Sequence, residues 1–154
     1  MLVNKDKLFL GLANRFAEIY TGCMKVHVGC AIVNKEGNVV GLGANTSNPC
    51  CKDKGMCHRV ELYGNNSKEH RLPSDCNAVH SEINAIIDAG KECNGATAYV
   101  TRYPCEACAR ALVQAGIKKV VYGRTQEISN LTKEILKGIE IVWEKDWEAE
   151  DVIE

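Results

Sequence analysis

The sequences HSEINAI at residues 80–86 and PCEAC at residues 104–108 carry most of what this chain predicts about its fold and its chemistry. They place His80, Cys105 and Cys108, which are one imidazole and two thiols, next to runs of apolar residues. Imidazole nitrogens and thiolates are typical zinc ligands, and a structural zinc site is usually closed by four protein groups. A catalytic site instead keeps one position open for water. Three ligands therefore predict a catalytic zinc centre.

Both sequences also predict helices that begin at the ligands. Pro104 suits a helix start because its missing N–H has no helical partner there. The apolar spacing then continues through Ala107, Ala111, Leu112 and Ala115. Two cysteines three residues apart share a face of the first turn, where free N–H groups and the helix dipole favour their thiolates. His80 opens a second helix, which we expect to stop at Gly90 and whose apolar residues are Ile83, Ala85, Ile86 and Ile87.

The pattern H-x-E followed by P-C-x-x-C resembles the signature of the zinc deaminases, which hydrolyse an amino group from a ring carbon of a base. In that chemistry zinc lowers the pKa of a water molecule. Glu82 is the candidate general acid/base, which would accept the proton of water, pass it to the ring nitrogen and protonate the departing ammonia. A C-x-x-C alone also fits a structural zinc knuckle or a redox pair. Pro104 before it and the carboxylate two residues after His80 favour the deaminase site.

The composition restricts the class of protein. A chain of 154 residues predicts one domain, residues 1–154, with an ordinary buried core. The net charge is −1 and the basic residues are scattered, so nucleic acid is not the expected partner. No apolar stretch is long enough to cross a membrane, and the N-terminus lacks a signal-peptide pattern. Nine cysteines favour metal ligation over a disulfide framework, and a cytoplasmic location is expected.

The remaining pattern predicts a mixed sheet covered by helices. Leu8, Leu12, Phe16 and Ile19 recur at helical spacing and predict an opening helix at about residues 4–21. We expect this apolar stripe to face the core. A hairpin follows, with strands at residues 26–33 and 39–43. Strands and helices then alternate, with further strands at 96–101, 119–122 and 139–143 and a helix at 130–136. The acidic tail, residues 144–154, is expected at the surface.

A Cys- and His-rich insertion at about residues 45–78 interrupts this alternation. A loop of this length inside a compact domain normally has a function or an internal staple. Four ligands closing a structural zinc would supply such a staple. The candidate ligands are Cys50, Cys51, Cys57, His58, His70 and Cys76, with Cys23 upstream. The alternative is that several of them are small buried thiols and that both histidines face solvent.

Between about residues 23 and 122 the chain resembles the cytidine and deoxycytidylate deaminase family, and most closely its deoxycytidylate (dCMP) branch. The matching blocks stand in the family's order, and they are VGCAIV at 28–33, GAN at 43–45, HSEINAI at 80–86, YVT at 99–101, PCEACA at 104–109 and VVY at 120–122. The resemblance implies a three-layer α/β/α domain with a five-stranded mixed sheet.

The same resemblance implies roles for individual residues. The family's zinc ligands correspond to His80, Cys105 and Cys108, its proton shuttle to Glu82, and its substrate-binding asparagine to Asn45. Some dCMP deaminases carry a second, structural zinc with cysteines at the positions of Cys23 and of the pair at residues 50–51. This favours a second zinc held by the region of Cys23, Cys50, Cys51, Cys57 and Cys76. Family members are commonly dimers or hexamers, so a homo-oligomer is expected.

One departure from the family concerns the substrate phosphate. Members of the dCMP branch usually carry a tyrosine near that phosphate, a few residues past the VVY strand, whereas this chain has GRTQE at 123–127. Arg124 and Arg102 could replace the tyrosine with charge-assisted contacts, or they could be solvated surface residues.

The predicted reaction is zinc-dependent hydrolytic deamination of a free cytosine nucleotide, dCMP to dUMP plus ammonia. One alternative is a deaminase of a nucleoside or another aminated heterocycle. A second alternative, a deaminase acting on a polynucleotide, would need a basic groove and stacking aromatic residues. The near-neutral charge and the small number of aromatic residues argue against it. A zinc module without activity is the last alternative, and it would have no use for Glu82.

Overall fold

A mixed β-sheet forms the centre of the molecule. The computed structural model describes residues 4–69, 75–147 and 149, and within them five strands lie in the order β2-β1-β3-β4-β5. The strands are β1 (Gly29–Val33), β2 (Val39–Ala44), β3 (Thr97–Arg102), β4 (Lys119–Arg124) and β5 (Glu140–Trp143). Strand β1 pairs antiparallel with β2 and β3, whereas β3, β4 and β5 run parallel to one another. The predicted five-stranded mixed sheet is confirmed.

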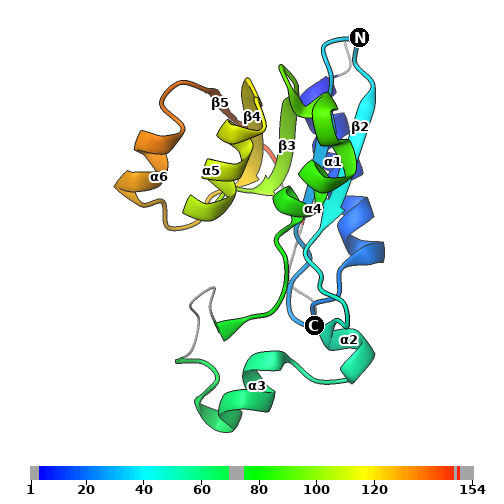
Figure 1. Ribbon diagram of the computed structural model, residues 1–154, viewed down its shortest axis with the longest axis vertical. Helices are drawn as coiled ribbons and strands as arrows, with labels where there is room; N and C mark the ends of the chain where they lie inside the picture. Colours follow the sequence, from blue (N-terminus) through cyan, green and yellow to red (C-terminus); the bar gives the residue numbers. More distant parts are fainter. Residues whose placement is uncertain (1–3, 70–74, 148, 150–154) are drawn as a thin grey trace.

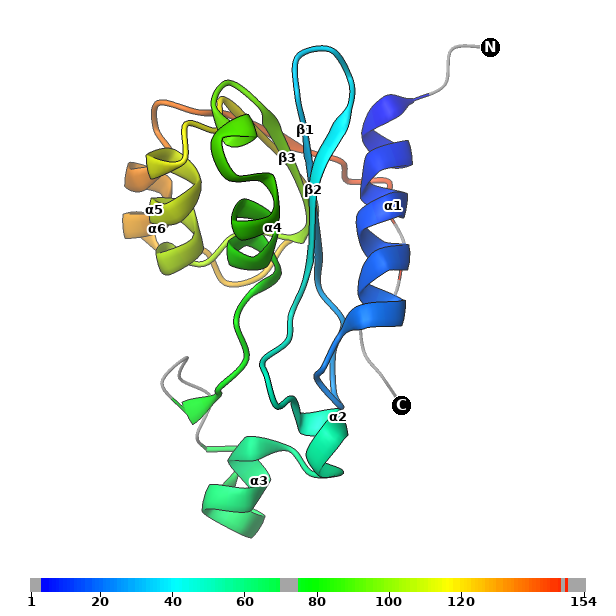
Figure 2. The ribbon, with the colours of Figure 1, turned by 45° about the vertical axis from the view of Figure 1, so that its right-hand side comes forward.

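Helices cover both faces of this sheet (Figures 1 and 2). Helix α1 (Lys5–Tyr20) lies on one face, and α4 (Ser81–Ala89) and α5 (Glu106–Gln114) lie on the other, with α6 (Asn130–Ile135) beside α5. A 3₁₀ turn, η3 (Gly90–Cys93), follows α4. This arrangement is the predicted three-layer α/β/α architecture.

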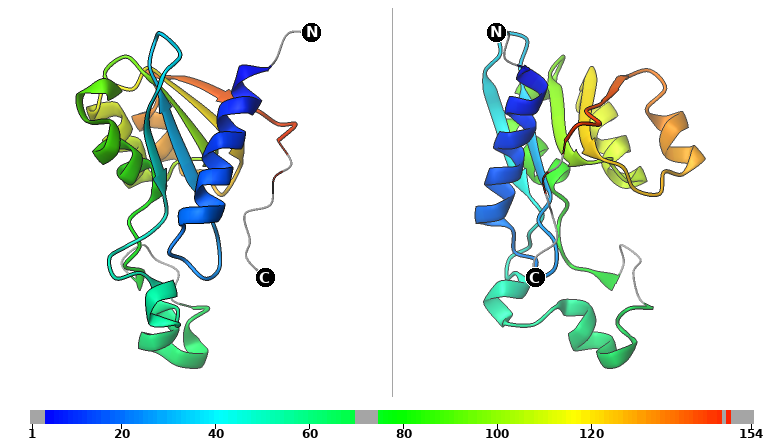
Figure 3. Two further views of the ribbon diagram at one scale, coloured as in Figure 1. Left: turned by 90° about the vertical axis from the view of Figure 1, so that its right-hand side faces the viewer. Right: turned by 180° about the vertical axis from the view of Figure 1, so that it is seen from behind.

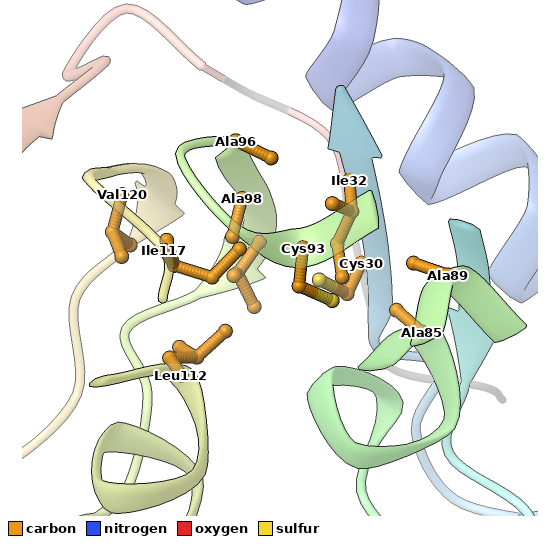
Figure 4. Close-up of a cluster of buried hydrophobic side chains, with 11 residues drawn as sticks. Cys30, Ile32, Ala85, Ala89, Cys93, Ala96, Ala98, Leu112, Ile117 and Val120 are labelled. Carbon is orange, nitrogen blue, oxygen red and sulfur yellow. The ribbon is translucent and has the colours of Figure 1, made fainter. Parts of the chain in front are cut away.

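The main core lies between the sheet and the α4–α5 layer (Figure 4). Its fully or nearly fully buried members are Cys30, Ile32, Ala85, Ala89, Cys93, Ala96, Ala98, Val100, Leu112, Ile117 and Val120. All five residues of β1 are buried, as expected for a strand in the middle of a sheet that is covered on both faces. The core therefore anchors the helices that carry the two sequence motifs.

The apolar stripe predicted for the opening helix does not face the core. Leu8 and Ile19 are each 57% exposed, and Leu12 is also exposed. The buried face of α1 instead consists of Leu10, Ala13, Asn14 and Ala17. The reason is the close approach of α1 to β1: a Cβ added at Gly29 would lie 2.0 Å from the Ala13 carbonyl oxygen, so only small side chains fit there.

Helices α4 and α5 differ from the prediction in smaller ways. Ile87 points to solvent, and Ala107 is exposed, whereas Cys108, Ala109 and Leu112 form the buried face of α5. Pro104 lies outside the helix, because Cys105 is its N-cap and the first helical residue is Glu106. Gly90 ends α4 with a positive φ of 56°, as predicted.

The insertion projects beyond one end of the sheet (Figure 3), where it contains α2 (Cys51–Lys54), α3 (His58–Tyr63) and the 3₁₀ turn η1 (Gly64–Asn66). An isolated bridge between Thr46 and Val79 closes its base, with N–O distances of 3.0 and 2.8 Å. His70, one of the predicted ligands, lies outside the described residues. The first strand starts only at Gly29 and not at residue 26. The Val28 amide and the Val26 carbonyl oxygen instead form hydrogen bonds with the Asn45 side chain.

Two further observations concern the rest of the chain. Trp147, in the tail predicted to be at the surface, is half-buried and packs on the core cluster beside α1. Among the described residues, no helix combines the length and the apolar character that crossing a membrane requires.

Candidate active site

His80, Cys105 and Cys108 converge at one point. The Sγ atoms of Cys105 and Cys108 lie 3.5 and 3.4 Å from Nδ1 of His80. Among the described residues, these three form the one set of His, Cys, Asp or Glu ligand atoms that all lie within 4.8 Å of one another. An imidazole nitrogen and two sulfurs at such separations form a donor set that suits Zn²⁺.

Two helix N-termini create this convergence. His80 is the N-cap of α4, and Cys105 is the N-cap of α5. Because α5 begins directly after Cys105, Cys108 lies in its first turn and on the same side as Cys105. The chain thus presents ligands at the ends of two helices whose other ends are fixed in the core.

Helix α4 is held against β2 by close contact and by hydrogen bonds. A Cβ added at Gly43 would lie 2.1 Å from the Ser81 carbonyl oxygen and 2.4 Å from the Ala85 nitrogen, so this position requires glycine. The Asn84 side chain donates to the Ala44 carbonyl oxygen at 2.8 Å. These contacts determine where His80 and the residues after it lie relative to the sheet.

The two thiols titrate very differently when no metal is bound. A hydrogen bond from Cys108, aided by one from His80, lowers the pKa of Cys105 to about 4. The Cys105 partner and burial raise the pKa of Cys108 far above that of an ordinary thiol. The pair therefore holds one thiolate and one proton at neutral pH. The Cys105 contact also raises the pKa of His80, which burial and the positive charge of Arg59 oppose.

Glu82 lies in the first turn of α4 and is only 4% exposed. Burial raises the pKa of its carboxyl, while its own backbone amide, His80 and Ser81 oppose that change. The Ser81 hydroxyl donates to Oε2 at 3.1 Å and so fixes the direction of the carboxyl. A buried carboxyl with a raised pKa can both take up and release a proton near neutral pH.

His80, Glu82 and Cys105 line a common cavity of about 230 Å³, which we call the catalytic cavity. Polar side chains that line the same cavity are those of Asn45, Arg59, Arg102 and Gln126. The sequence did not single out Arg59 or Gln126. Both belong to segments without a motif, and only the folded chain brings them to the ligands.

Asn45 lines the catalytic cavity, but its side chain also holds the surrounding loops together. Its Oδ1 accepts hydrogen bonds from the Thr21 hydroxyl at 2.8 Å and from the Val28 amide at 2.9 Å. Its Nδ2 donates to the Val26 carbonyl oxygen at 3.2 Å. An amide group carries two N–H bonds, so this network leaves one for another acceptor.

The two arginines considered for the phosphate are placed differently. Arg102, at the end of β3, lines the catalytic cavity. Arg124 does not line that cavity. Its guanidinium donates to the carbonyl oxygen of Ala149, and it lines a surface hollow with Trp143 and Trp147 that Arg102 also lines.

The cysteines of the insertion form a second group. Cys23, Cys51, Cys57 and Cys76 line one cavity of about 350 Å³, which we call the cysteine cavity. Burial raises the pKa of Cys51, and the other three thiols add to this effect. Cys50 does not line this cavity, since it is the N-cap of α2 and its amide donates to the Asp53 carboxylate at 3.1 Å.

Known proteins show the same architecture. A crystal structure of the dCMP deaminase from cyanophage S-TIM5, in complex with dCMP and dUMP, matches with a TM-score of 0.66 at 22% identity. The match covers 93% of this chain and 98% of that one. At this identity the likeness establishes the fold. An α/β/α sandwich with one histidine and two cysteines beside a buried glutamate is the arrangement of the zinc-dependent deaminases as a class.

Sequence comparison then gives the family. The family described as the cytidine and deoxycytidylate deaminase zinc-binding region matches residues 3–124, and the chain belongs to it. The deoxycytidylate deaminase of Mycobacterium phage D29 is 35% identical over 126 residues, which are 76% of this chain and 92% of that protein. The human deoxycytidylate deaminase is 35% identical over 96 residues, which are 62% of this chain and 51% of the relative. The chain therefore spans about half the length of that human relative.

Proposed function

We propose that this protein catalyses the zinc-dependent hydrolytic deamination of a free cytosine nucleotide, dCMP to dUMP with release of ammonia. The observation that carries the proposal is the presence of a buried carboxylate, Glu82, in the same cavity as His80 and Cys105. A metal site without chemistry has no use for such a group. The phage relative of similar length is a deoxycytidylate deaminase, which supports the nucleotide as substrate.

His80, Cys105 and Cys108 would hold the zinc ion. The donor set fits, because three ligands converge from rigid helix ends and a catalytic zinc site takes three protein ligands. Bound zinc supplies a water molecule of lowered pKa and a positive charge beside the reacting carbon. Cys108 must lose its proton to bind zinc, so the affinity for zinc should fall as the pH is lowered.

Glu82 would move the protons of the reaction. Its carboxylate accepts the proton of the attacking water and passes it to the ring nitrogen beside the amino-bearing carbon. Glu82 would then take the second proton from the hydroxyl that has added to the ring carbon and pass it to the amino group, so that the C–N bond breaks, ammonia leaves and the oxygen stays on the carbon as a carbonyl. Burial raises the pKa of Glu82, which suits both the uptake and the release of a proton. The hydrogen bond from Ser81 would keep the carboxyl oriented between the two proton transfers.

Asn45 would orient the substrate. Its position on the wall of the catalytic cavity and its remaining N–H bond allow a hydrogen bond to an oxygen of the nucleotide. The other bonds of this side chain hold the segments around residues 21, 26 and 28, so the substrate contact would be rigid.

We further propose that a second, structural zinc ion binds in the insertion. The cysteine cavity narrows the predicted region of five cysteines to Cys23, Cys51, Cys57 and Cys76. Four thiolates complete a structural zinc site, and the short helices α2 and α3 have few other stabilising contacts. The single domain of residues 1–154, the homo-oligomer and the cytoplasmic location stay predictions.

The substrate can be tested with purified, zinc-loaded protein mixed separately with dCMP, CMP, dCTP, deoxycytidine and cytosine, with ammonia release as the readout. Preference for dCMP is the expected result. Equal or faster release from deoxycytidine would favour a nucleoside deaminase. Absence of ammonia from all compounds, with zinc bound, would contradict the proposed activity.

A further inference from the structure

Helix α1 lies on the outside of the sheet (Figure 2), and the side of it that points away from the sheet is apolar. Leu8 and Ile19 are each 57% exposed, and Tyr20 is 60% exposed. Leu12, between them, is 38% exposed. Phe16 is half-buried, and its ring packs on that of Tyr20 with a centroid distance of 4.6 Å. Residues three and four apart share one side of a helix, so these five form a continuous row, which we call the outer face of α1.

The outer face leaves α1 apolar on two sides. Its inner side, with Leu10, Ala13 and Ala17, is buried on the sheet. A surface helix normally has one apolar and one polar side, whereas a helix that is apolar all round is buried. Single apolar side chains at a surface are common, but a contiguous exposed row of them marks an interaction site. The outer face of α1 therefore has the character of a contact with another protein surface.

The charges at the two ends of α1 indicate what that surface is. The first turn carries Lys5 and Lys7, which are both exposed, while Asp6 between them is half-buried. The last turn contains no basic residue, and Arg15 one turn earlier is bound to Glu18 at 2.8 Å. Cations are unfavourable at the N-terminal end of the helix dipole and favourable at its C-terminal end. The opposite end of a second α1 would therefore complement each end of this helix.

A second copy in antiparallel orientation fits the apolar row as well as the charges. With Leu12 at a two-fold axis, Leu8 lies opposite Phe16 of the other copy, because each is four residues from Leu12. Lys5 lies opposite Ile19 of the other copy and beside the C-terminal carbonyl groups of that helix. The two-fold axis makes each of these contacts occur twice. A parallel arrangement would instead bring the lysine-bearing ends together.

We propose that the outer face of α1 is a self-association surface, which binds α1 of a second copy of this chain in antiparallel orientation. A helix of 16 residues is about 24 Å long, so one such pair buries less than the roughly 800 Å² per partner of a standard interface. The association should therefore depend on protein concentration. The inference goes beyond the proposed function, since among the described residues those that line the catalytic cavity and the cysteine cavity lie outside α1.

The test is the mass of the zinc-loaded protein as a function of concentration, measured by analytical ultracentrifugation with a phosphine reductant to prevent disulfides. Wild type should associate as its concentration rises. Leu12→Glu should weaken the association by about 100-fold, because it removes an apolar contact and places two carboxylates across the axis. Leu131→Glu is the matched control, because this leucine of α6 is 46% exposed and lies outside the outer face. It should associate like wild type.

Two substitutions at one position test the orientation. Ile19→Glu and Ile19→Lys remove the same apolar contact, but the antiparallel pair places residue 19 beside Lys5 of the other copy. Ile19→Glu should therefore associate about 10-fold more tightly than Ile19→Lys. In a parallel pair residue 19 would meet its own copy, and the two variants would be equally weak. Equal association of the two variants overturns the antiparallel orientation.

The remaining outcomes also decide the inference. Circular dichroism and zinc content verify that each variant is folded, and if Leu12→Glu fails to fold, Leu8→Glu takes its place. A wild-type protein that is monomeric at every concentration overturns the inference and leaves the outer face to a different partner. An associated wild type whose mass Leu12→Glu does not change also overturns it, because the copies then meet through another surface.

Discussion

The two cysteine groups of this protein are built in different ways. His80, Cys105 and Cys108 are carried by the N-termini of α4 and α5, which are fixed on the sheet, and their ligand atoms already lie within 4.8 Å of one another. Cys23, Cys51, Cys57 and Cys76 lie on loops and short helices around a cavity, and they do not form such a compact set. The first group is organised by the fold, whereas the second would be organised by its metal.

This difference has a functional consequence. A catalytic metal must hold its geometry through every turnover, which rigid helix ends provide. A structural metal instead contributes its binding energy to the folding of a segment that lacks a core. The insertion has few buried apolar residues of its own, and α3 has none.

The largest expected effect is that of Cys108→Ala. Removing one of three ligands should abolish the active-site zinc and reduce turnover to background. The measurement is zinc per chain together with ammonia release. Cys93→Ala is the control, since it removes a fully buried thiol of the core that does not belong to the ligand set. Unchanged zinc in Cys108→Ala would show that the first cysteine group is not the metal site.

Glu82→Gln should keep the zinc and lower turnover by about 10²- to 10⁴-fold, the usual contribution of a general acid/base. The physical reason is that the amide cannot accept the proton of water. The exposed Glu92→Gln provides a matched control. Full activity of Glu82→Gln would remove Glu82 from the mechanism.

Cys51 and Cys50, which are neighbours in the sequence, provide a test of whether the second cysteine group binds zinc. Cys51→Ala should lose about one zinc per chain, because Cys51 lines the cysteine cavity, while Cys50→Ala should lose none. Both variants should retain the active-site zinc. A count of one zinc in wild-type protein, measured by elemental analysis, would rule out the structural site.

The sequence predicted the fold class and the convergence of His80, Cys105 and Cys108, because both depend on local patterns. A histidine and a cysteine at helix starts, and a second cysteine one turn later, leave little freedom in where the ligands lie. The core-facing side of α1 was predicted wrongly, because the prediction followed the spacing of the largest apolar residues, whereas the close approach of α1 to Gly29 brings the side with Ala13 and Ala17 onto the sheet. The position of Arg59 on the wall of the catalytic cavity could not be predicted, since it depends on the tertiary path of the insertion.

The rigidity of the first group can be tested at Gly43. Gly43→Ala should lower the free energy of unfolding by about 1–3 kcal/mol, because the added methyl group overlaps Ser81 and Ala85 on α4. Activity should fall as well, since α4 carries His80 and Glu82. Gly11→Ala is the control in open space on α1, and it should stabilise the protein by about 0.5–1 kcal/mol. Denaturation by urea measures both, and equal effects would contradict the close packing.

The smallest effect concerns the pH dependence of stability in metal-free protein. Burial raises the pKa of Glu82 above its ordinary value of 4.5. Protonation of Glu82 therefore stabilises the fold at low pH, and this stabilisation is lost as the pH rises through the folded pKa. Glu82→Gln stays neutral, so it should be more stable than wild type at about pH 7.5 and similar at about pH 4. Urea denaturation at both values measures the difference; an advantage that grows toward low pH would contradict the sign.

The most direct test of the account is the product formed from dCMP by the zinc-loaded wild-type protein. Chromatography and an ammonia assay on the same sample follow both products at once. The account predicts dUMP and ammonia in equal amounts, formed at a rate proportional to the zinc bound by His80, Cys105 and Cys108. Intact dCMP after prolonged incubation, with zinc present at this site, would contradict it.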